Sequence, residues 1–425
     1  MKPLPAGIRR FADLAEGSMY FADNTRFISL LDEGDDSYVY FVRPEGFGKT
    51  LFVSMLEAYY DIASSDRFDR WFHDTWIHDH VTADQGRYQV LRLDLSGVSG
   101  DPRELESSFE QVACSQITRL AEKYASFYDP DFLPVMAGFS RAALKLNHFC
   151  VQARLKGYML YLLVDDYDSI ARAVLSAAGS SAPGAWNASD ATLFYRDFFR
   201  MVKTGFSRIF MTGTFPLTMD DLTSGFNIAT NLTTDPRYNA MLGFSLEDLR
   251  QLLSRCRSQN LQGDLDPGEI AAALASWCGG YCFSGRTFLQ KETVLNSRMV
   301  LECLAKILET GQIPGELAVA PDPGAAAVLK LSAGGRGRSG NEAGRAEHLL
   351  SALDGSGAGN TVMPQMVAGI PAEQLAEDGH FISRCFSLGA LTVTGADLGR
   401  PVLGIPNQNV RCQLRELLGL GEKAA

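Results

Sequence analysis

Residues 43–50 read Arg-Pro-Glu-Gly-Phe-Gly-Lys-Thr, an order of residue types that could bind phosphate. A phosphate-binding loop needs backbone N–H groups that converge on the anion, a helix N-terminus aimed at it, a lysine as a point charge and a hydroxyl for magnesium. Here Gly48 lets the backbone approach the phosphates, Lys49 reaches the β and γ oxygens, and Thr50 ligates the metal. The expected nucleotide contacts are Arg43, Gly46, Phe47, Gly48, Lys49, Thr50 and Leu51.

The Gly-Lys-Thr tripeptide is weak evidence alone, because it also arises in polar turns with an exposed lysine, and Arg43 replaces the first glycine of the usual pattern. A second feature supports the site: the apolar run 158–164 ends in Asp165 and Asp166. At the end of such a strand one acid holds Mg²⁺ through water, and the next orients or deprotonates the attacking water. Ligands of open α/β sheets bind at this edge, so the two features together predict a nucleotide site.

Thr212 follows another apolar run, 207–211, and we expect it close to the γ-phosphate. It joins Lys49 and Asp166 as a predicted catalytic residue. The alternative for Thr212 is a strand threonine whose hydroxyl is satisfied by the backbone. The alternative for Asp166 is a cap on the turn that follows it.

The elements that must position these residues alternate between strand and helix. The predicted strands cover residues 37–42, 89–95, 158–164 and 207–211, with a fifth at 238–242, and helical patterns span 51–60, 102–124 and 193–202. Near-continuous apolar character, as in 158–164, is what a parallel strand buried on both faces requires. The predicted fold is therefore an α/β P-loop NTPase core over residues 1–244, a parallel sheet with helices on both faces.

Beyond residue 244 the pattern changes. A helical lid region is expected at 245–313, with helices at 245–257, 267–277 and 297–309. Glycine and proline mark a flexible linker or insert at 314–343. Residues 344–425 predict a small C-terminal α+β module, of which a winged helix is one form, with a helix at 345–353, strands at 390–394 and 401–405, and a last helix capped by Asn407.

The 425 residues carry a net charge of −11, which lowers the expectation of a surface dedicated to DNA or RNA without excluding a local basic groove. No run approaches the ~20 apolar residues of a membrane span, so no membrane partner is expected. The eight cysteines are scattered, and Cys278 and Cys282 lack further zinc ligands at a suitable spacing. Reduced thiols fit a cytoplasmic location.

A series of short motifs resembles the AAA-ATPase-like family, whose members are often fused to a nuclease-like domain of the PD-(D/E)XK type. The matching stretches are residues 19–25 (MYFADNT), 43–51, 54–56, 163–168 (LVDDYD), 212–216 (TGTFP), 226–228, 235–238 (DPRY), 243–245, 277–283 (WCGGYCF) and 405–407. They cover most of residues 5–310 and resume near 380–418. The resemblance implies a P-loop ATPase that uses ATP and Mg²⁺.

The chain departs from the family pattern at several positions. The usual loop reads Arg-Pro-Arg-Arg-Phe-Gly-Lys-Thr, so Arg43 is normal there, but Glu45 and Gly46 replace two arginines. Asn24 stands for a lysine and Asp166 for a glutamate, which shortens the presumed base by one methylene. Cys278 and Cys282 replace a Tyr or Asp and an Arg. Only 13 residues follow Cys412, and 314–380 lack the Asp and Glu-x-Lys strands of a nuclease, so we expect no nuclease half here.

Three functions remain open at this point. The first is a Mg-dependent ATPase with slow hydrolysis, and the second is a nucleotide-gated scaffold or signalling switch with little or no turnover. The third, an accessory factor in nucleic-acid processing, rests on the family's nuclease partners alone. The expected partner is a nucleotide, with a protein partner or a second copy of the chain left open, as is ATP over GTP.

Overall fold

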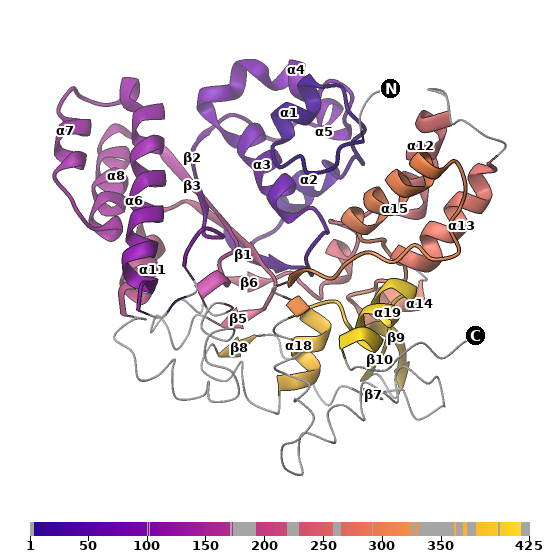
Figure 1. The fold of residues 1–425 in the computed structure, drawn as a ribbon. Helices are drawn as coiled ribbons and strands as arrows, with labels where there is room; N and C mark the ends of the chain where they lie inside the picture. The colour runs from indigo at the N-terminus through magenta and orange to yellow at the C-terminus, as the bar shows by residue number, and fades with distance from the viewer. Residues whose placement is uncertain are drawn as a thin grey trace, which may run out of the picture.

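The computed structural model describes residues 4–99, 101, 103–170, 172, 193–218, 229–257, 265–290, 292–323, 325–326, 329, 361–362, 369–371, 380–397 and 400–417. Figure 1 shows a central sheet with helices on both sides of it, and the C-terminal elements below it in that view.

A five-stranded parallel sheet forms the centre of the fold. Its strands, in the order β2-β3-β4-β1-β6, are β2 (Tyr88–Asp94), β3 (Met159–Asp165), β4 (Arg208–Gly213), β1 (Tyr38–Val42) and β6 (Thr230–Asn231). The four longer strands confirm the predicted ones. The register pairs Phe41 with Thr212 and Leu163 with Phe210. Because β4 lies between β1 and β3, the loop after β1 and the acids at the end of β3 meet at one edge.

Both faces of the sheet are buried, which explains the apolar run of β3. Leu160, Leu162 and Val164 pack into the cluster formed with helices α6 (Leu105–Lys123), α8 (Ala142–Lys156) and α11 (Leu193–Gly205). Tyr161 and Leu163 face the other cluster, which contains α3 (Lys49–Tyr60). Alternate residues of one strand thus enter two cores, and the predicted α/β class is confirmed.

Short helices complete the core. They are α1 (Phe11–Glu16), α2 (Arg26–Asp32), α4 (Phe68–Phe72), α5 (Trp76–Asp79) and α7 (Phe132–Ala137). The region after residue 244, which the sequence predicts as a lid, holds α12 (Leu246–Arg257), α13 (Pro267–Cys278), α14 (Gly285–Leu289) and α15 (Ser297–Thr310), with helix bounds close to those expected.

The C-terminal module combines helices with a small antiparallel sheet. Its elements are β7 (Thr361–Val362), α18 (Phe381–Ser387), β9 (Thr392–Asp397), β10 (Arg400–Gly404) and α19 (Gln408–Leu417), with sheet order β7-β10-β9. The Asn407 carboxamide accepts a bond from Val410 N at 3.1 Å, the cap that the sequence predicted. A second short pair, β5 (Leu217–Thr218) with β8 (Ile370–Pro371), joins the module to the core.

The fifth strand was predicted in the wrong place. Residues 238–242 follow a 3₁₀ turn, Pro236–Tyr238, that begins at Asp235, whose carboxylate accepts a bond from Arg237 N at 2.9 Å. Met241 and Leu242 are buried without strand pairing, so their apolar character reflects core packing rather than a strand. The fifth strand is β6, only two residues long.

The predicted linker also begins inside the core. Leu317 is 0% exposed and Val319 is 3% exposed, and Val319 N donates to the Asn409 carboxamide oxygen at 2.7 Å. Residues 317–319 are thus fixed to the C-terminal module. Residues 330–343, and the helix expected at 345–353, lie outside the described residues.

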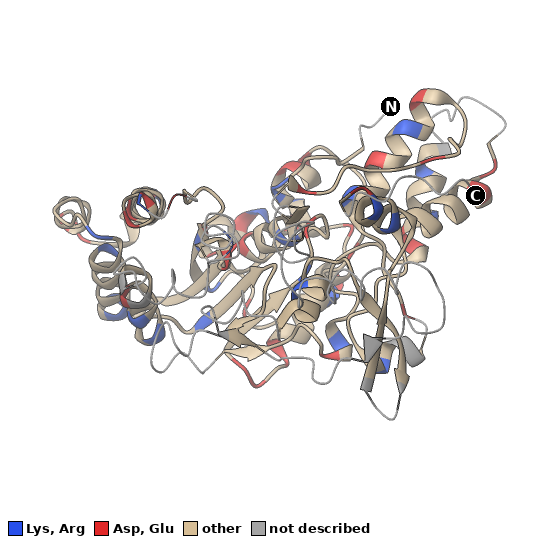
Figure 2. Cartoon of the chain, turned by 60° about the horizontal axis from the view of Figure 1, so that its bottom comes forward, with Lys and Arg blue, Asp and Glu red and all other residues tan. Residues whose placement is uncertain are grey.

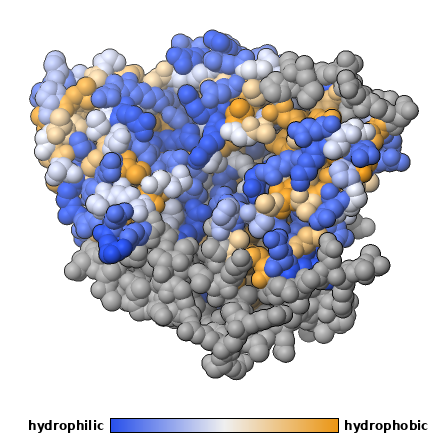
Figure 3. Space-filling view, viewed as in Figure 1, coloured by the Kyte–Doolittle hydropathy of each residue, from blue (hydrophilic) through white to orange (hydrophobic). Residues whose placement is uncertain are grey.

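The surface carries both acidic and basic residues, and some large apolar side chains are exposed. Basic and acidic residues are interspersed along the described helices (Figure 2). In Figure 3 apolar side chains gather at the left edge, over α7 and α8. Leu144, Val151 and Leu155 of α8 are exposed. Among the described residues, no helix combines the length and apolar character needed to cross a membrane.

Candidate nucleotide site

The loop between β1 and α3 has the conformation that its glycines allow. Gly46 and Gly48 have φ angles of +87° and +92°, a region that a side chain disfavours. Phe47 between them is buried and packs edge-on against Tyr281 and Phe283, with ring centroids 5.0 and 5.5 Å apart. The aromatic anchor fixes the middle of the loop, and α3 begins at Lys49 as the phosphate-site prediction requires.

Lys49 lies inside this loop. Its Nζ donates to the carbonyl oxygens of Arg43 at 2.9 Å and Pro44 at 3.1 Å, and lies 3.7 Å from the Glu45 carboxylate. The residue is 6% exposed. The ammonium is therefore held at the centre of the loop by main-chain oxygens, where a phosphate can replace them as partners.

The side chain of Arg43 does not face the loop, which corrects its predicted role as a nucleotide contact. It is 1% exposed, and its guanidinium lies 4.0 Å from the centre of the Phe41 ring and 3.9 Å from that of Phe283. It donates to the carbonyl oxygens of Val42, Thr233 and Tyr238 at 2.8–3.1 Å. Burial lowers the pKa of Arg43. Arg43 belongs to the loop through its backbone, and its side chain ties β1 to the turn after β6.

Asp165 ends β3 with a fully buried carboxylate. Neither oxygen has a hydrogen-bond partner among the described residues. Arg92 approaches to 3.8 Å. Burial raises the pKa of Asp165, and the nearby Thr50 hydroxyl opposes part of that rise. A buried carboxylate with unused acceptors is costly. Because Mg²⁺ takes one or two carboxylates together with waters and phosphate oxygens, Asp165 and Thr50 fit that ion.

Asp166 adopts a backbone conformation rare for a residue with a side chain, with φ +54°. Its carboxylate pairs with Arg172 at 3.1 Å. Burial raises the pKa of Asp166 to about 7, an effect that Arg172 and Lys49 oppose. Such a carboxyl changes protonation near neutral pH, which suits a group that exchanges a proton with water.

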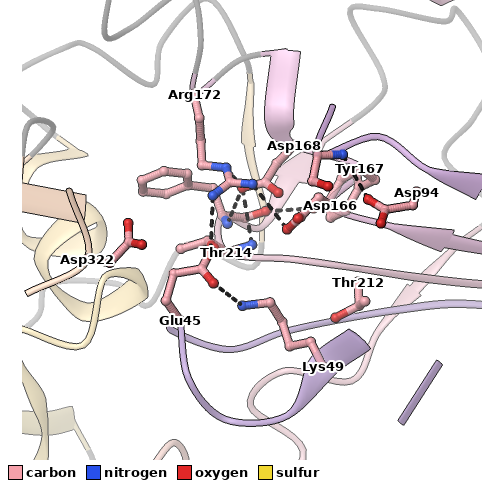
Figure 4. A network of polar contacts seen from close by, with 12 residues as sticks. Glu45, Lys49, Asp94, Asp166, Tyr167, Asp168, Arg172, Thr212, Thr214 and Asp322 are labelled. Carbon is pink, nitrogen blue, oxygen red and sulfur yellow. Dashed lines mark hydrogen bonds and ion pairs between the residues drawn. The ribbon is translucent and has the colours of Figure 1, made fainter. Parts of the chain in front are cut away.

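Thr212 and Thr214 differ in what their hydroxyls bind. Thr212 donates to the Phe41 carbonyl oxygen at 2.7 Å. This is the alternative in which the backbone satisfies the threonine hydroxyl, so the catalytic role of Thr212 stays a prediction. Thr214, two residues further on, donates to the Glu45 carboxylate at 3.1 Å. Its backbone N–H is held by Asp168 at 3.1 Å. Figure 4 shows Thr214 facing Glu45.

Arg172 is a member of the site that the motifs did not reveal. Its guanidinium lies 3.0 Å from Glu45, 3.1 Å from Asp166 and 3.5 Å from Asp168 (Figure 4). The four-residue spacing from Asp168 was a signal of helical pairing in the sequence. The contact with Glu45 had no such signal, because these residues are 127 positions apart.

A cavity of about 580 Å³ opens over the loop. Its lining includes residues 45–52 and Asp166, with apolar residues of the N-terminal segment such as Pro5, Ile8 and Phe21. The volume lies within the ~300–1,000 Å³ of small-molecule sites, which join apolar walls to a few polar groups. The predicted contacts Gly46 to Leu51 all line this cavity.

Helix α15, in the region predicted as a lid, is hydrogen-bonded to the main chain of the loop. Asn296, which caps α15, donates to the Glu45 carbonyl oxygen at 2.8 Å, and Arg298 N donates to the Gly46 carbonyl oxygen at 2.9 Å. A Cβ on Gly46 would come within 2.5 Å of the Asn296 carboxamide oxygen. The absence of a side chain at Gly46 therefore allows this close approach.

Comparison with known proteins agrees with this geometry. The chain belongs to the family described as predicted AAA-ATPase, whose model matches residues 5–223, more than half of the chain. The strand–loop–helix with Lys49 and the acidic end of β3 are the parts of a P-loop ATPase fold.

One curated relative is an uncharacterized protein in the vnfD 5′ region of Azotobacter chroococcum mcd 1. It is 26% identical over 302 residues, and the match covers 67% of this chain and 49% of that protein. The chain thus spans about half the length of this relative.

Three solved structures from Aeropyrum pernix are similar over nearly the whole chain, each at 12% identity. They are the ORC2 protein in its ADPNP–ADP complexes (TM-score 0.33, covering 98% of this chain and 97% of that one), the ORC2 protein in its ADP form (TM-score 0.37, 99% and 97%) and the ORC1 protein in complex with DNA (TM-score 0.30, 96% and 96%).

Proposed function

We propose that this chain binds MgATP and hydrolyses it slowly. The observation that carries the proposal is the buried Asp165 carboxylate, whose oxygens have no hydrogen-bond partner among the described residues and lie close to the hydroxyl of Thr50 and across the sheet edge from Lys49. The cavity over the loop supports it, because it offers phosphate-binding groups together with apolar walls for a base and sugar.

Each residue has a defined task in this proposal. Lys49 exchanges its two carbonyl partners for phosphate oxygens, and the backbone around Gly48 approaches the same anion. Thr50 and Asp165 would hold Mg²⁺, which when bound would neutralise charge that develops on the phosphates. Asp166 orients the water that attacks in line with the leaving oxygen and accepts its proton.

Slow turnover follows from the state of Asp166. In the ligand-free chain the pKa of Asp166 is about 7, so a large share of this carboxyl is protonated at neutral pH, and a protonated acid cannot accept a proton from water. In the ionised fraction, the carboxylate is held by its ion pair with Arg172, 3.1 Å away. Aspartate is shorter than glutamate by one methylene, and ~1 Å of misplacement can reduce a rate on the order of 10²-fold.

The second candidate is a nucleotide-gated switch, favoured by the bonds between α15 and the loop. A change in the loop at Glu45 or Gly46 would move or break the bonds to Asn296 and Arg298. The useful output would then be a lid rearrangement on binding rather than turnover.

The test uses the purified full chain with MgATP. Affinity is measured by calorimetry and phosphate release at steady state. We expect Lys49→Ala to weaken binding at least ~100-fold, because charge-assisted contacts contribute about 1.5–3 kcal/mol each. Lys156→Ala is the matched control, since Lys156 pairs only with Asp129 on the surface among the contacts described. Parent-like ATP affinity in Lys49→Ala would show that the loop does not bind phosphate.

The same measurements separate the two candidates. A parent that binds MgATP and releases phosphate slowly, with the rate rising in Asp166→Glu, supports the ATPase. A parent that binds with similar affinity but shows no turnover in either form supports the switch.

A further inference from the structure

Glu45 is the centre of a cluster of positive and hydrogen-donating groups. Its carboxylate lies 3.0 Å from the Arg172 guanidinium, 3.1 Å from the Thr214 hydroxyl and 3.7 Å from Lys49 Nζ. These partners come from three separate elements: the segment after β3, the end of β4 and the start of α3. Figure 4 shows them converging on one anion.

This convergence matches what a phosphate group requires. An anion held by an ammonium, a guanidinium and a hydroxyl is a phosphate-binding arrangement, and arginine is the preferred partner of both carboxylate and phosphate. The positive charges of Lys49 and Arg172 lower the pKa of Glu45, so its carboxylate is charged. Glu45 also lines the cavity over the loop together with Gly46 and Lys49.

We propose that Glu45 occupies the place of the terminal phosphate in the ligand-free protein, and that Arg172 recognises that phosphate once Glu45 is displaced. The proposal rests on the proposed function, since it assumes a nucleotide in this cavity. Arg172 is then a specificity residue that distinguishes a nucleoside triphosphate from a diphosphate.

The charges explain why displacement is required. A terminal phosphate near Lys49 would lie close to the Glu45 carboxylate, and like charges at such distances repel strongly away from bulk water. Arg172 remains held by Asp166 and Asp168 when Glu45 leaves, so its guanidinium stays in position. A diphosphate has no third phosphate to compete for these partners, and it leaves the Glu45–Arg172 pair intact.

The same exchange explains how the chain tolerates an acid in this loop. Relatives were expected to carry arginine at positions 45 and 46, where this chain has Glu45 and Gly46. In this chain the positive charge beside Glu45 is supplied by Arg172, which comes from the segment after β3.

The first variant to test is Glu45→Gln, which removes the charge and keeps the shape. Calorimetric affinities are measured for ATP and ADP, each with Mg²⁺, on the full chain. We expect ATP to bind about tenfold more tightly than to the parent, equivalent to ~1.4 kcal/mol, with ADP affinity changed less than about twofold. An unchanged ratio of ATP to ADP affinity would overturn the role of Glu45.

The second step places Arg172→Gln in the Glu45→Gln background. If Arg172 contacts the terminal phosphate, ATP affinity falls again by about tenfold while ADP affinity is kept. If Arg172 is only the counterion of Glu45, the second substitution has no effect on the ratio, and its role is overturned. Arg172→Lys keeps the charge without the guanidinium fork, and we expect an intermediate ratio.

Control variants distinguish a failure of this inference from misfolding and from a failure of the proposed function. Glu106→Gln and Arg141→Gln break a similar surface carboxylate–guanidinium pair, 3.1 Å apart, between α6 and the residue that precedes α8, and we expect parent affinities from both. Retained ADP affinity shows that a variant is folded with an intact cavity. If neither parent nor Glu45→Gln binds ATP or ADP, the proposed function is wrong and this inference with it.

Discussion

Replacing Arg43 with methionine tests whether this side chain holds the fold or binds phosphate. Methionine fills similar volume but has no donor, so the carbonyl oxygens of Val42 and Thr233 would lose this partner, whereas that of Tyr238 keeps its bond from Met241 N. A buried acceptor left unpaired costs about 1–3 kcal/mol, which gives ~2–6 kcal/mol for two. We expect the lower half of this range, ~3 kcal/mol, because the variant no longer buries a charge.

The assay is urea unfolding followed by tryptophan fluorescence. With a slope of ~3 kcal/mol per molar urea, a loss of ~3 kcal/mol lowers the midpoint by about 1 M. ATP affinity of the folded variant, measured without urea, should stay within about threefold of the parent. Arg103→Met is the control, since its side chain is 89% exposed. A variant with parent stability and lost ATP binding would refute the reasoning, because Arg43 would then act on the phosphates.

Further predictions concern the metal, the base and the loop. Asp165→Asn should remove the Mg²⁺ dependence of nucleotide affinity, and an unchanged magnesium titration would contradict that role. Asp166→Glu should hydrolyse ATP faster than the parent and Asp166→Asn slower, at similar ATP affinity, so rates indifferent to both changes would remove Asp166 from the mechanism. Because the pKa of Asp166 is raised to about 7 in the folded chain, its protonated carboxyl stabilises the fold, fully so below about pH 4. This stabilisation is lost as pH rises through 7. Asp166→Asn should therefore gain stability over the parent between pH 5 and 8 without nucleotide or Mg²⁺, by at most ~4 kcal/mol, because the pKa of Asp166 is about 7 against an ordinary value of 3.8. A stability difference that is independent of pH would contradict this. Gly46→Ala should lower the thermal midpoint, because its Cβ meets Asn296 at 2.5 Å and its φ is +87°, whereas parent-like melting would show that the lid helix yields easily.

The sequence predicted those elements whose apolar or capping pattern lies within one short segment of the chain. The apolar run of β3 was visible because both faces of that strand are buried, and Asn407 was recognised as a cap from its place before a helix. β6 escaped notice because two residues cannot display a period. The apolar residues of 238–242 suggested a strand, although tertiary packing alone buries them.

The residues of the candidate site also divide into those with a signal in the nearby sequence and those without one. Lys49, Thr50 and Asp165 could be predicted as site residues because loop order and strand ends are visible along the chain. Arg172 and Thr214 were missed because their partner, Glu45, is distant in sequence. The inward direction of Arg43 depended on Phe283, a residue of the lid, and could not be read from the loop motif.

The close approach of Gly46 and Asn296 has a consequence for how this family changes over evolutionary time. A side chain at position 46 and a carboxamide placed as in Asn296 would occupy the same space, since a Cβ would lie 2.5 Å from the amide oxygen. Substitution at one position thus requires prior or simultaneous change at the other. We expect homologues with arginine at position 46 to lack this asparagine contact, and to join lid and loop by other bonds. Positions 46 and 296, far apart in sequence, should therefore covary.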